Sequence, residues 1–317
     1  MTYTQMTKTR SLWFVSFGIS ILLIGLLLWV VDLTSLNAAL GEVKLPLLLA
    51  ALVPLTAEAL ITSKRIQYCA DGAVPFSRAV YSNAWYVLWL GVLPARLGEV
   101  AGIGVFKKVL GMSNGSAIAS IVVQRIYDLT ILSGLLVLFM SQIWLDGQLS
   151  IWIAVGIFIL LVLLIMTLPF WLSTSARCLY GLNHRHRIAR GVLRIILQAK
   201  SWYRSRQHQR VVMRLVLATL AKWLVNLVAV LLIFSACHIQ VDLATLLVIC
   251  ILIHFLGAIP IQSVGGFGVV EVGLTGLLVA AQVPVTDAVA ASLMLRMMSL
   301  GYAAIFFISS FILLRSR

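Results

Sequence analysis

Eight ionisable side chains interrupt otherwise apolar stretches of this sequence, and they are the residues whose types could do chemistry. Four are acidic and four are basic: Glu58, Glu99, Asp128, Glu271, Arg96, Arg125, Lys222 and Arg296. A guanidinium group offers paired N–H donors that match a phosphate group, and a carboxylate can hold an arginine or carry a proton. The combination predicts ion pairs or a polar cavity that binds an anionic headgroup.

Position along the apolar stretches divides these residues into two groups. The candidate substrate-binding site comprises Arg96, Glu99, Arg125, Asp128, Glu271 and Arg296. A purely structural ion-pair network is the alternative for this group. Glu58 and Lys222 lie nearer the ends of their spans, so we expect snorkelling or placement at the membrane interface to explain both. For His254, in ICILIHFLGAIP, we expect a hydrogen-bonded core role rather than proton relay.

Composition indicates whether these residues lie in a membrane protein or in a soluble one. Of 317 residues, 62% are hydrophobic and 11% are charged, against about 45–50% and about 25% in soluble proteins. We therefore expect an all-α, polytopic membrane protein with almost no soluble domain. The four cysteines are scattered and no histidine stands at metal-ligand spacing, so we expect no disulfide framework, metal site or cofactor. The sequence has no HExxH, GxSxG, Walker or nucleotide-binding motif. We therefore expect neither an enzyme nor an ATP-driven step.

Apolar runs and their interruptions predict full spans and hairpins. Full spans, at about 20 residues each, are expected near 12–31, 45–63, 115–141, 151–172, 211–236 and 288–314. Two further regions, 79–106 and 243–281, are apolar but broken by LPARLGE and IPIQSVGGFGVVE. Such broken backbone is tolerated at membrane depth only where protein or a water-filled cavity surrounds it. Each region is therefore predicted to be a re-entrant helical hairpin.

Basic residues determine the expected orientation. With the N-terminus in the cytoplasm, 19 of the 24 lysines and arginines lie on the cytoplasmic side and only Lys44 lies outside. Arg78 and Lys107 then flank the first hairpin on the inside, whereas Asp242 and Asp287 flank the second hairpin on the outside. We expect an integral protein of the bacterial cytoplasmic membrane with both termini in the cytoplasm.

The two hairpins belong to a predicted internal repeat. Each precedes a span with an embedded arginine, because SAIASIVVQR ends at Arg125 and DAVAASLMLR ends at Arg296. Glu99 lies 26 residues before the first arginine, and Glu271 lies 25 residues before the second. Chance similarity between helices rich in small residues is the alternative. We expect a single domain over residues 1–317. It would contain two inverted-topology repeats, 12–141 and 151–314, which is an architecture of transporters.

The connector between the repeats, 173–210, is basic and contains no acid. Its apolar residues fall on one helical face, while Arg187, Arg190 and Arg194 fall on the other. This pattern predicts an amphipathic helix on the cytoplasmic leaflet, where the arginines contact anionic headgroups. A connector that simply obeys the positive-inside rule is the alternative.

Taken in order along the chain, LPARLGE, SAIASIVVQRIYDL, IPIQSVGGFGVVE and DAVAASLMLR resemble the lysylphosphatidylglycerol synthase transmembrane-region family. This is the flippase-like domain of the multiple peptide resistance factor, and it also occurs as stand-alone proteins. The resemblance spans nearly the whole chain and implies movement of a lipid or lipid-linked molecule between leaflets. The family usually has Glu where this chain has Gln124, and Arg where it has Val270. Both departures remove a charge, so we expect substrate or coupling to differ.

Charge pattern and resemblance together predict a flippase-like transporter that moves an anionic phospholipid or polyprenyl-linked lipid without ATP. The expected partners are membrane lipids, a separate lipid-modifying enzyme and a second copy of the chain, but no nucleic acid. One alternative is an intramembrane enzyme acting on lipid phosphates, for which only His254 or the hairpin acids could serve as base. The other is a non-transporting scaffold for a lipid-modifying enzyme.

Overall fold

Helices form all the regular structure in the part of the chain that the structure describes, which confirms the all-α class for that part. The computed structural model describes residues 32–70, 74–93, 97–144, 148–166, 208–258 and 268–315, together with a few residues between 18 and 29 and residue 197. The expected first span and most of the basic connector, including Arg187, Arg190 and Arg194, lie outside these residues. Arg96 at the tip of the first hairpin lies outside them too.

Four long helices dominate the described part: α3 (Leu45–Cys69), α6 (Asn114–Trp144), α10 (His208–Ala236) and α13 (Val285–Arg315). Each contains a stretch long and apolar enough to cross a membrane. At about 1.5 Å per residue they exceed the ~30 Å hydrocarbon core. Their outer faces also expose large apolar side chains, among them Val53, Leu217 and Met297. Lipid stabilises such faces and water does not, so the chain is an integral membrane protein.

Two shorter helices, α4 (Phe76–Val92) and α5 (Leu97–Leu110), pack against each other where the first hairpin is expected. With 17 and 14 residues, each rises only about 21–26 Å, less than the hydrocarbon core. A β-carbon at Gly98 would lie 2.6 Å from the backbone oxygen of Trp89. Glycine thus permits the close contact between the two helices.

A second pair of short helices follows α10: α11 (Leu243–Ala258) and α12 (Val269–Ala280), with 16 and 12 residues. Gly268, the capping residue just before α12, has a φ of 94°, in the left-handed region that favours glycine. Both predicted hairpins are therefore pairs of short helices. That each pair enters and leaves the membrane at one face stays a prediction.

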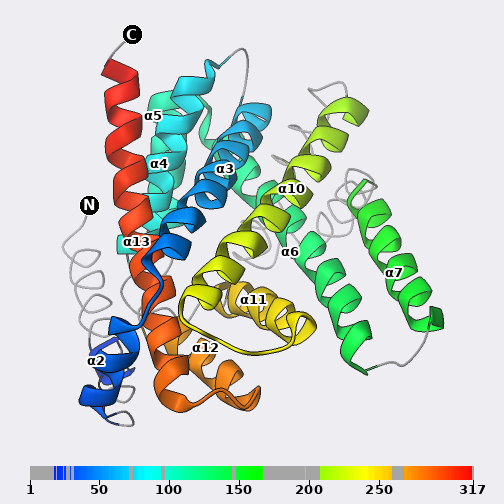
Figure 1. Ribbon diagram of the computed structural model, residues 1–317. Coiled ribbons are helices and arrows are strands. Elements are labelled where there is room, and N and C mark those ends of the chain that lie inside the picture. The colour runs from blue at the N-terminus through cyan, green and yellow to red at the C-terminus, as the bar shows by residue number, and fades with distance from the viewer. Residues whose placement is uncertain are drawn as a thin grey trace, which may run out of the picture.

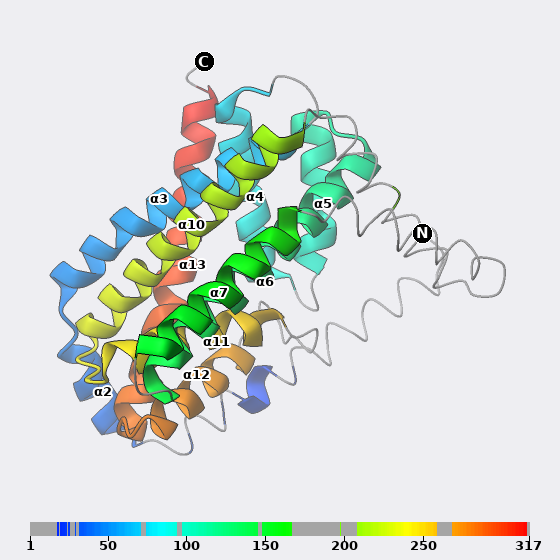
Figure 2. The same ribbon diagram turned by 90° about the vertical axis from the view of Figure 1, so that its right-hand side faces the viewer.

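The two hairpins lie toward opposite ends of the molecule (Figures 1 and 2). The α4–α5 pair lies in the half where α13 ends, and the α11–α12 pair in the half where α13 begins. Helices α3 and α10 form the most extensive contact in the described part of the chain. They run antiparallel, because the backbone N–H of Lys44, before α3, donates to the carbonyl of Ala236, the last residue of α10. Helix α2 (Leu33–Gly41) packs on α13, and α7 (Gln148–Met166) packs on α6.

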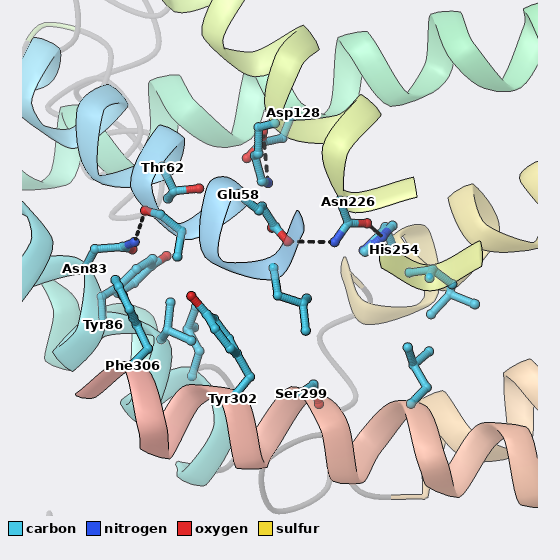
Figure 3. A pocket seen from close by; sticks show the side chains of 18 of the residues that line it. Glu58, Thr62, Asn83, Tyr86, Asp128, Asn226, His254, Ser299, Tyr302 and Phe306 are labelled. Atoms are coloured by element: carbon cyan, nitrogen blue, oxygen red, sulfur yellow. Dashed lines mark hydrogen bonds and ion pairs between the residues drawn. The ribbon is translucent and has the colours of Figure 1, made fainter. Parts of the chain in front are cut away.

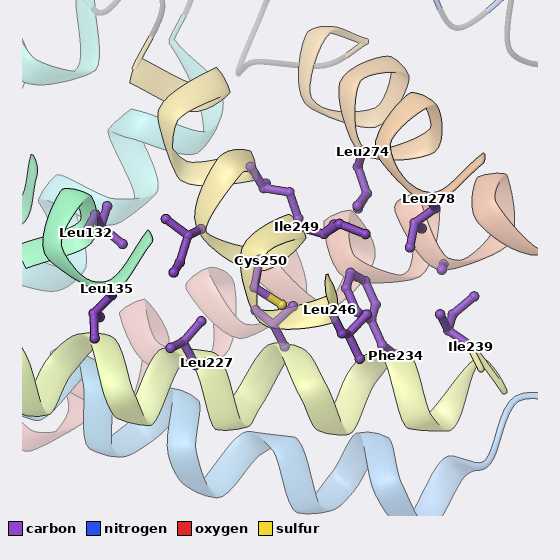
Figure 4. Packing of buried hydrophobic residues seen from close by; sticks show 14 of the residues in the cluster. Leu132, Leu135, Leu227, Phe234, Ile239, Leu246, Ile249, Cys250, Leu274 and Leu278 are labelled. Atoms are coloured by element: carbon purple, nitrogen blue, oxygen red, sulfur yellow. The ribbon is translucent and has the colours of Figure 1, made fainter. Parts of the chain in front are cut away.

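The largest hydrophobic cluster joins α6, α10, α11 and α12 (Figure 4). Leu132 and Leu135 of α6 face Leu227 of α10, and Phe234 lies near Leu246 of α11. This cluster fixes the second hairpin against two long helices. The cluster therefore fixes the positions of the side chains that these helices project toward the centre of the molecule.

Candidate functional site

A cavity of about 380 Å³ lies between the two hairpins and the four long helices (Figure 3). All eight helices from α3 to α6 and from α10 to α13 contribute lining residues. Most of its surface is apolar, and the charged lining residues are Glu58, Arg65, Arg125, Asp128, Lys222, Glu271 and Arg296. The volume is in the range of small-ligand sites, about 300–1,000 Å³.

Asp128 of α6 is the centre of the most buried charged cluster. Its Oδ1 lies 3.0 Å from Nη2 of Arg65 and 3.4 Å from Nζ of Lys222. The indole N–H of Trp223 also donates to Oδ1, at 3.0 Å. Arg65 in turn donates to the carbonyl of Gln124, at 3.2 Å. The carboxylate thus ties α3, α6 and α10 together, and its cations offset the cost of burying its charge.

Each hairpin carries a glutamate that pairs with an arginine on the following long helix. In the first half, Nη2 of Arg125 lies 3.1 Å from Oε1 of Glu99. In the second half, Nε of Arg296 donates to Oε1 of Glu271. Oε2 of Glu271 accepts from the backbone N–H of Gly268 at 2.7 Å, which caps the start of α12. In both pairs the glutamate lies on the second of two short helices and the arginine on the long helix that follows.

A third polar group joins α3, α10 and α11. The Nδ2 amide of Asn226 donates to Oε2 of Glu58 at 2.9 Å, and its Oδ1 lies 2.8 Å from Nε2 of His254. Because the amide oxygen can only accept, Nε2 of His254 carries the hydrogen of this bond. Figure 3 shows the three side chains in a row along the cavity.

Several expectations agree with this geometry. Ion pairs or a polar cavity were the two expected arrangements, and the structure contains both: Glu99 pairs with Arg125, Glu271 pairs with Arg296, and Asp128 lines the same cavity as both arginines. His254 is hydrogen-bonded, although it faces the cavity as well as the core. Whether these residues bind a substrate stays a prediction.

Two expectations are wrong. The sequence predicts Glu58 and Lys222 at the membrane interface, but Glu58 faces the cavity and the Lys222 side chain is only 11% exposed, beside Asp128. Both side chains lie inside the protein because each has a polar partner there, Asn226 for Glu58 and Asp128 for Lys222. Neither side chain therefore needs to reach water.

Arg65 follows the expected span 45–63 and so counts among the 19 basic residues expected on the cytoplasmic side, which misses it as a site residue. Helix α3 continues six residues beyond the expected span 45–63, and the Arg65 side chain is 1% exposed within it. Its spacing does carry a signal. Glu58, Thr62 and Arg65 lie at i, i+4 and i+7, which is one polar face of a helix.

One known protein family matches nearly the whole of this chain. A model of the lysylphosphatidylglycerol synthase transmembrane region matches residues 13–306. The chain belongs to this family. Every residue that lines the cavity, from Leu55 to Phe306, falls inside the match. No curated protein and no solved structure matches the chain. Membership in the lysylphosphatidylglycerol synthase transmembrane-region family is consistent with a lipid-related function in the membrane.

Proposed function

We propose that the chain is a flippase-like transporter that moves an anionic phospholipid or polyprenyl-linked lipid between leaflets without ATP. The observation that carries this proposal is the central, largely apolar cavity, whose charged lining includes four cations, with Arg125 and Arg296 the most exposed of them. Arginine suits a phosphate because its guanidinium donates two parallel hydrogen bonds. The headgroup would enter the cavity while the acyl chains stay in the surrounding lipid.

The order and contacts of the helices favour an inverted repeat, which would support transport by alternating access. Helices α3 to α6 correspond in order and type to α10 to α13, each set being a long helix, two short helices and a long helix. Contacts between the sets are reciprocal: α13 packs on α4, and α6 packs on α11. Each set also has its own glutamate–arginine pair. Transporters with this architecture bind substrate between their halves near the membrane midplane.

Charges at the two ends of the molecule support a cytoplasmic position for the end where α13 finishes. Basic residues at this end are Lys64, Arg78, Lys107, Lys108, Arg214 and Arg315. The opposite end carries Asp32, Glu42, Asp242 and Asp287, with Lys44 as the described basic residue. The positive-inside rule then favours a cytoplasmic C-terminus, and the expected first span at 12–31 would bring the N-terminus to the same side. This assignment fits a protein of the bacterial cytoplasmic membrane.

The alternative from another class is an intramembrane enzyme acting on lipid phosphates. Its supporting observation is His254, an imidazole that lines the same cavity as the arginines. A hydrolase or transferase would change the lipid covalently, whereas a transporter leaves it unchanged. Mass spectrometry of lipid recovered after incubation with the full chain distinguishes the two, since the transport proposal predicts recovery of the input lipid alone.

The test of the proposed function is translocation in liposomes that contain the full chain. Fluorescent phosphatidylglycerol is the anionic probe and fluorescent phosphatidylcholine is the zwitterionic comparison. A membrane-impermeant reductant then quenches only probe in the outer leaflet. We expect a larger fraction of the fluorescent phosphatidylglycerol to be quenched in liposomes with the protein than in protein-free liposomes. The quenched fraction of phosphatidylcholine should increase less. Equal values with and without protein for anionic probes would exclude the proposal.

A further inference from the structure

Glu58 differs from the other three intramembrane carboxylates in its partners. Asp128, Glu99 and Glu271 each form an ion pair with an arginine or lysine. Glu58 forms none with the described residues, and its hydrogen-bond partner is the neutral amide of Asn226. Of the four carboxylates, Glu58 is therefore the one that can take up a proton without breaking an ion pair among the described residues.

The other charged and titratable groups around Glu58 come from several helices. They are Arg65 from α3 itself, Tyr86 from α4, Asp128 from α6, Lys222 from α10, His254 from α11 and Tyr302 from α13. Among the cations, Lys222 lies one helical turn before Asn226, the hydrogen-bond partner of Glu58, and lines the same cavity. Lys222 also makes the longer of the two ion-pair contacts to Asp128, at 3.4 Å against 3.0 Å for Arg65. Asp128 would keep Arg65 and the Trp223 N–H if Lys222 moved away.

The charge of the site depends on Glu58. Arg65, Arg125, Lys222 and Arg296 carry four positive charges, and Glu99, Asp128 and Glu271 carry three negative charges. With Glu58 protonated, these described residues sum to one positive charge, which suits one anionic headgroup. With Glu58 ionised they sum to zero, and Lys222 has a second carboxylate to neutralise.

We propose that Glu58 is the site that binds a coupling proton, and that Lys222 is its exchangeable counter-ion. This inference rests on the proposed lipid transport. Protonated Glu58 leaves Lys222 on Asp128 and the site cationic, so a proton and an anionic headgroup bind together. When the carboxyl O–H gives its proton to cavity water, Lys222 moves to the new carboxylate and the cavity loses its net charge. Release of the proton therefore favours release of the lipid.

Reciprocity between the two ligands gives the proposal a measurable sign. If the proton strengthens binding of the anionic headgroup, the headgroup strengthens binding of the proton by the same factor. Lower pH should then increase affinity for phosphatidylglycerol, approaching about tenfold per pH unit where Glu58 titrates, the limit for one linked proton. Phosphatidylcholine, which carries no net charge, should respond much less.

The direct test is an infrared pH titration of the full chain in liposomes of phosphatidylcholine alone. A protonated carboxyl group has a C=O stretching band separate from that of a carboxylate. We expect a titrating band that is absent in Glu58→Gln, a variant that keeps the size of the side chain and an oxygen for Asn226. In Lys222→Gln the band should persist to higher pH, because the ionised form loses its counter-ion. A wild-type band that survives unchanged in Glu58→Gln overturns the proposal.

Asp32→Asn is the matched control. Asp32 is exposed, and hydrogen bonds from Thr34 and Ser35 lower its pKa to about 2, so it stays ionised throughout the titration. The control should leave the titrating band unchanged. Loss of the band in this variant as well as in Glu58→Gln would show a general effect of mutation and would also overturn the assignment.

A transport arm separates this inference from the proposed function. Wild type should move fluorescent phosphatidylglycerol faster at low pH, whereas Glu58→Gln should move it at a rate independent of pH. If wild type moves no probe, the proposed function fails, and the infrared titration still decides whether Glu58 binds the proton. If wild type moves the probe and keeps the same pH dependence in Glu58→Gln, transport stands and the coupling role of Glu58 is wrong.

Discussion

The four cations of the cavity differ in how much of each side chain is exposed. Arg65 is 1% exposed and Lys222 is 11%, and both contact Asp128. Arg296 is 15% exposed and Arg125 is 46%. An arginine without accessible surface cannot receive a headgroup, so Arg65 is a structural partner of Asp128. Arg125, followed by Arg296, is the residue best placed to meet a phosphate.

At Arg125 and Arg296, substitution by lysine separates a binding role from a structural one. Lysine keeps the positive charge but loses the planar fork, so phosphatidylglycerol translocation per folded molecule should fall about 10- to 100-fold, the equivalent of one charged hydrogen bond. Each single variant is compared with Arg214→Lys, which changes an exposed arginine near the start of α10. Wild-type transport per monodisperse molecule in both lysine variants would contradict phosphate binding by this pair.

Asp128 offers a test of the structural cluster. In Asp128→Asn, Arg65 and Lys222 lose the carboxylate that balances them inside the protein. Removing one partner of a buried ion pair costs about 3–5 kcal/mol, so the thermal unfolding midpoint of the full chain in detergent should fall substantially. Asp32→Asn changes an exposed carboxylate and should leave that midpoint nearly unchanged. Equal midpoints for the two variants would show that Asp128 does not hold the three helices together.

Residue patterns reveal part of the site and hide the rest. Both glutamate–arginine pairs could be predicted because the same types recur at nearly the same spacing in each half. Arg65 was harder to predict, because the apolar run ends before it and its spacing from Glu58 and Thr62 marks a polar helical face only if the helix continues past residue 63. The contact between Glu58 and Asn226 joins residues 168 positions apart, and it depends on how α3 and α10 are rotated against each other.

Among the elements, the first hairpin depends on close packing of its two short helices. Gly98→Ala would place a β-carbon against the backbone of Trp89 and Leu90, neither of which can move like a side-chain end. Overpacking of this kind costs about 1–3 kcal/mol, so the unfolding midpoint should fall. Gly104, on the same helix, has nothing within 4 Å of its added β-carbon. Gly104→Ala should keep or slightly raise the midpoint, and an equal loss in both variants would argue against the packing explanation.

The hairpins also make a prediction about membrane topology. In a variant whose native cysteines are replaced by alanine, cysteines at Arg78 and Lys108 should react only with a thiol reagent supplied from the cytoplasmic side. Cysteines at Gln240 and Pro284 should react only from outside. All four positions are exposed, so access depends on the side of the membrane. Labelling from opposite sides within either pair would show that the hairpin crosses the membrane fully, and the inverted repeat would fail.

Across the whole molecule, the long membrane-spanning helices could be predicted where long runs of apolar residues are least interrupted. Runs of apolar residues near 115–141 and 211–236 correspond to α6 and α10 within a few residues, because only a helix satisfies its backbone inside lipid. The central cavity was predictable only in kind. Its walls come from eight helices, and their relative placement depends on packing such as the cluster around Phe234 and Leu246.

The central claim is that an anionic lipid headgroup binds inside this cavity, between the two halves of the chain. The most direct measurement is a cryo-electron microscopy map of the full chain in nanodiscs that contain phosphatidylglycerol and phosphatidylcholine. The account predicts headgroup density within hydrogen-bonding distance of Arg125 and Arg296, with the acyl chains leading out toward lipid, and loss of that density in nanodiscs of phosphatidylcholine alone. A well-resolved cavity that holds no lipid density in either nanodisc, with lipid ordered only around the outer faces of the helices, would contradict it.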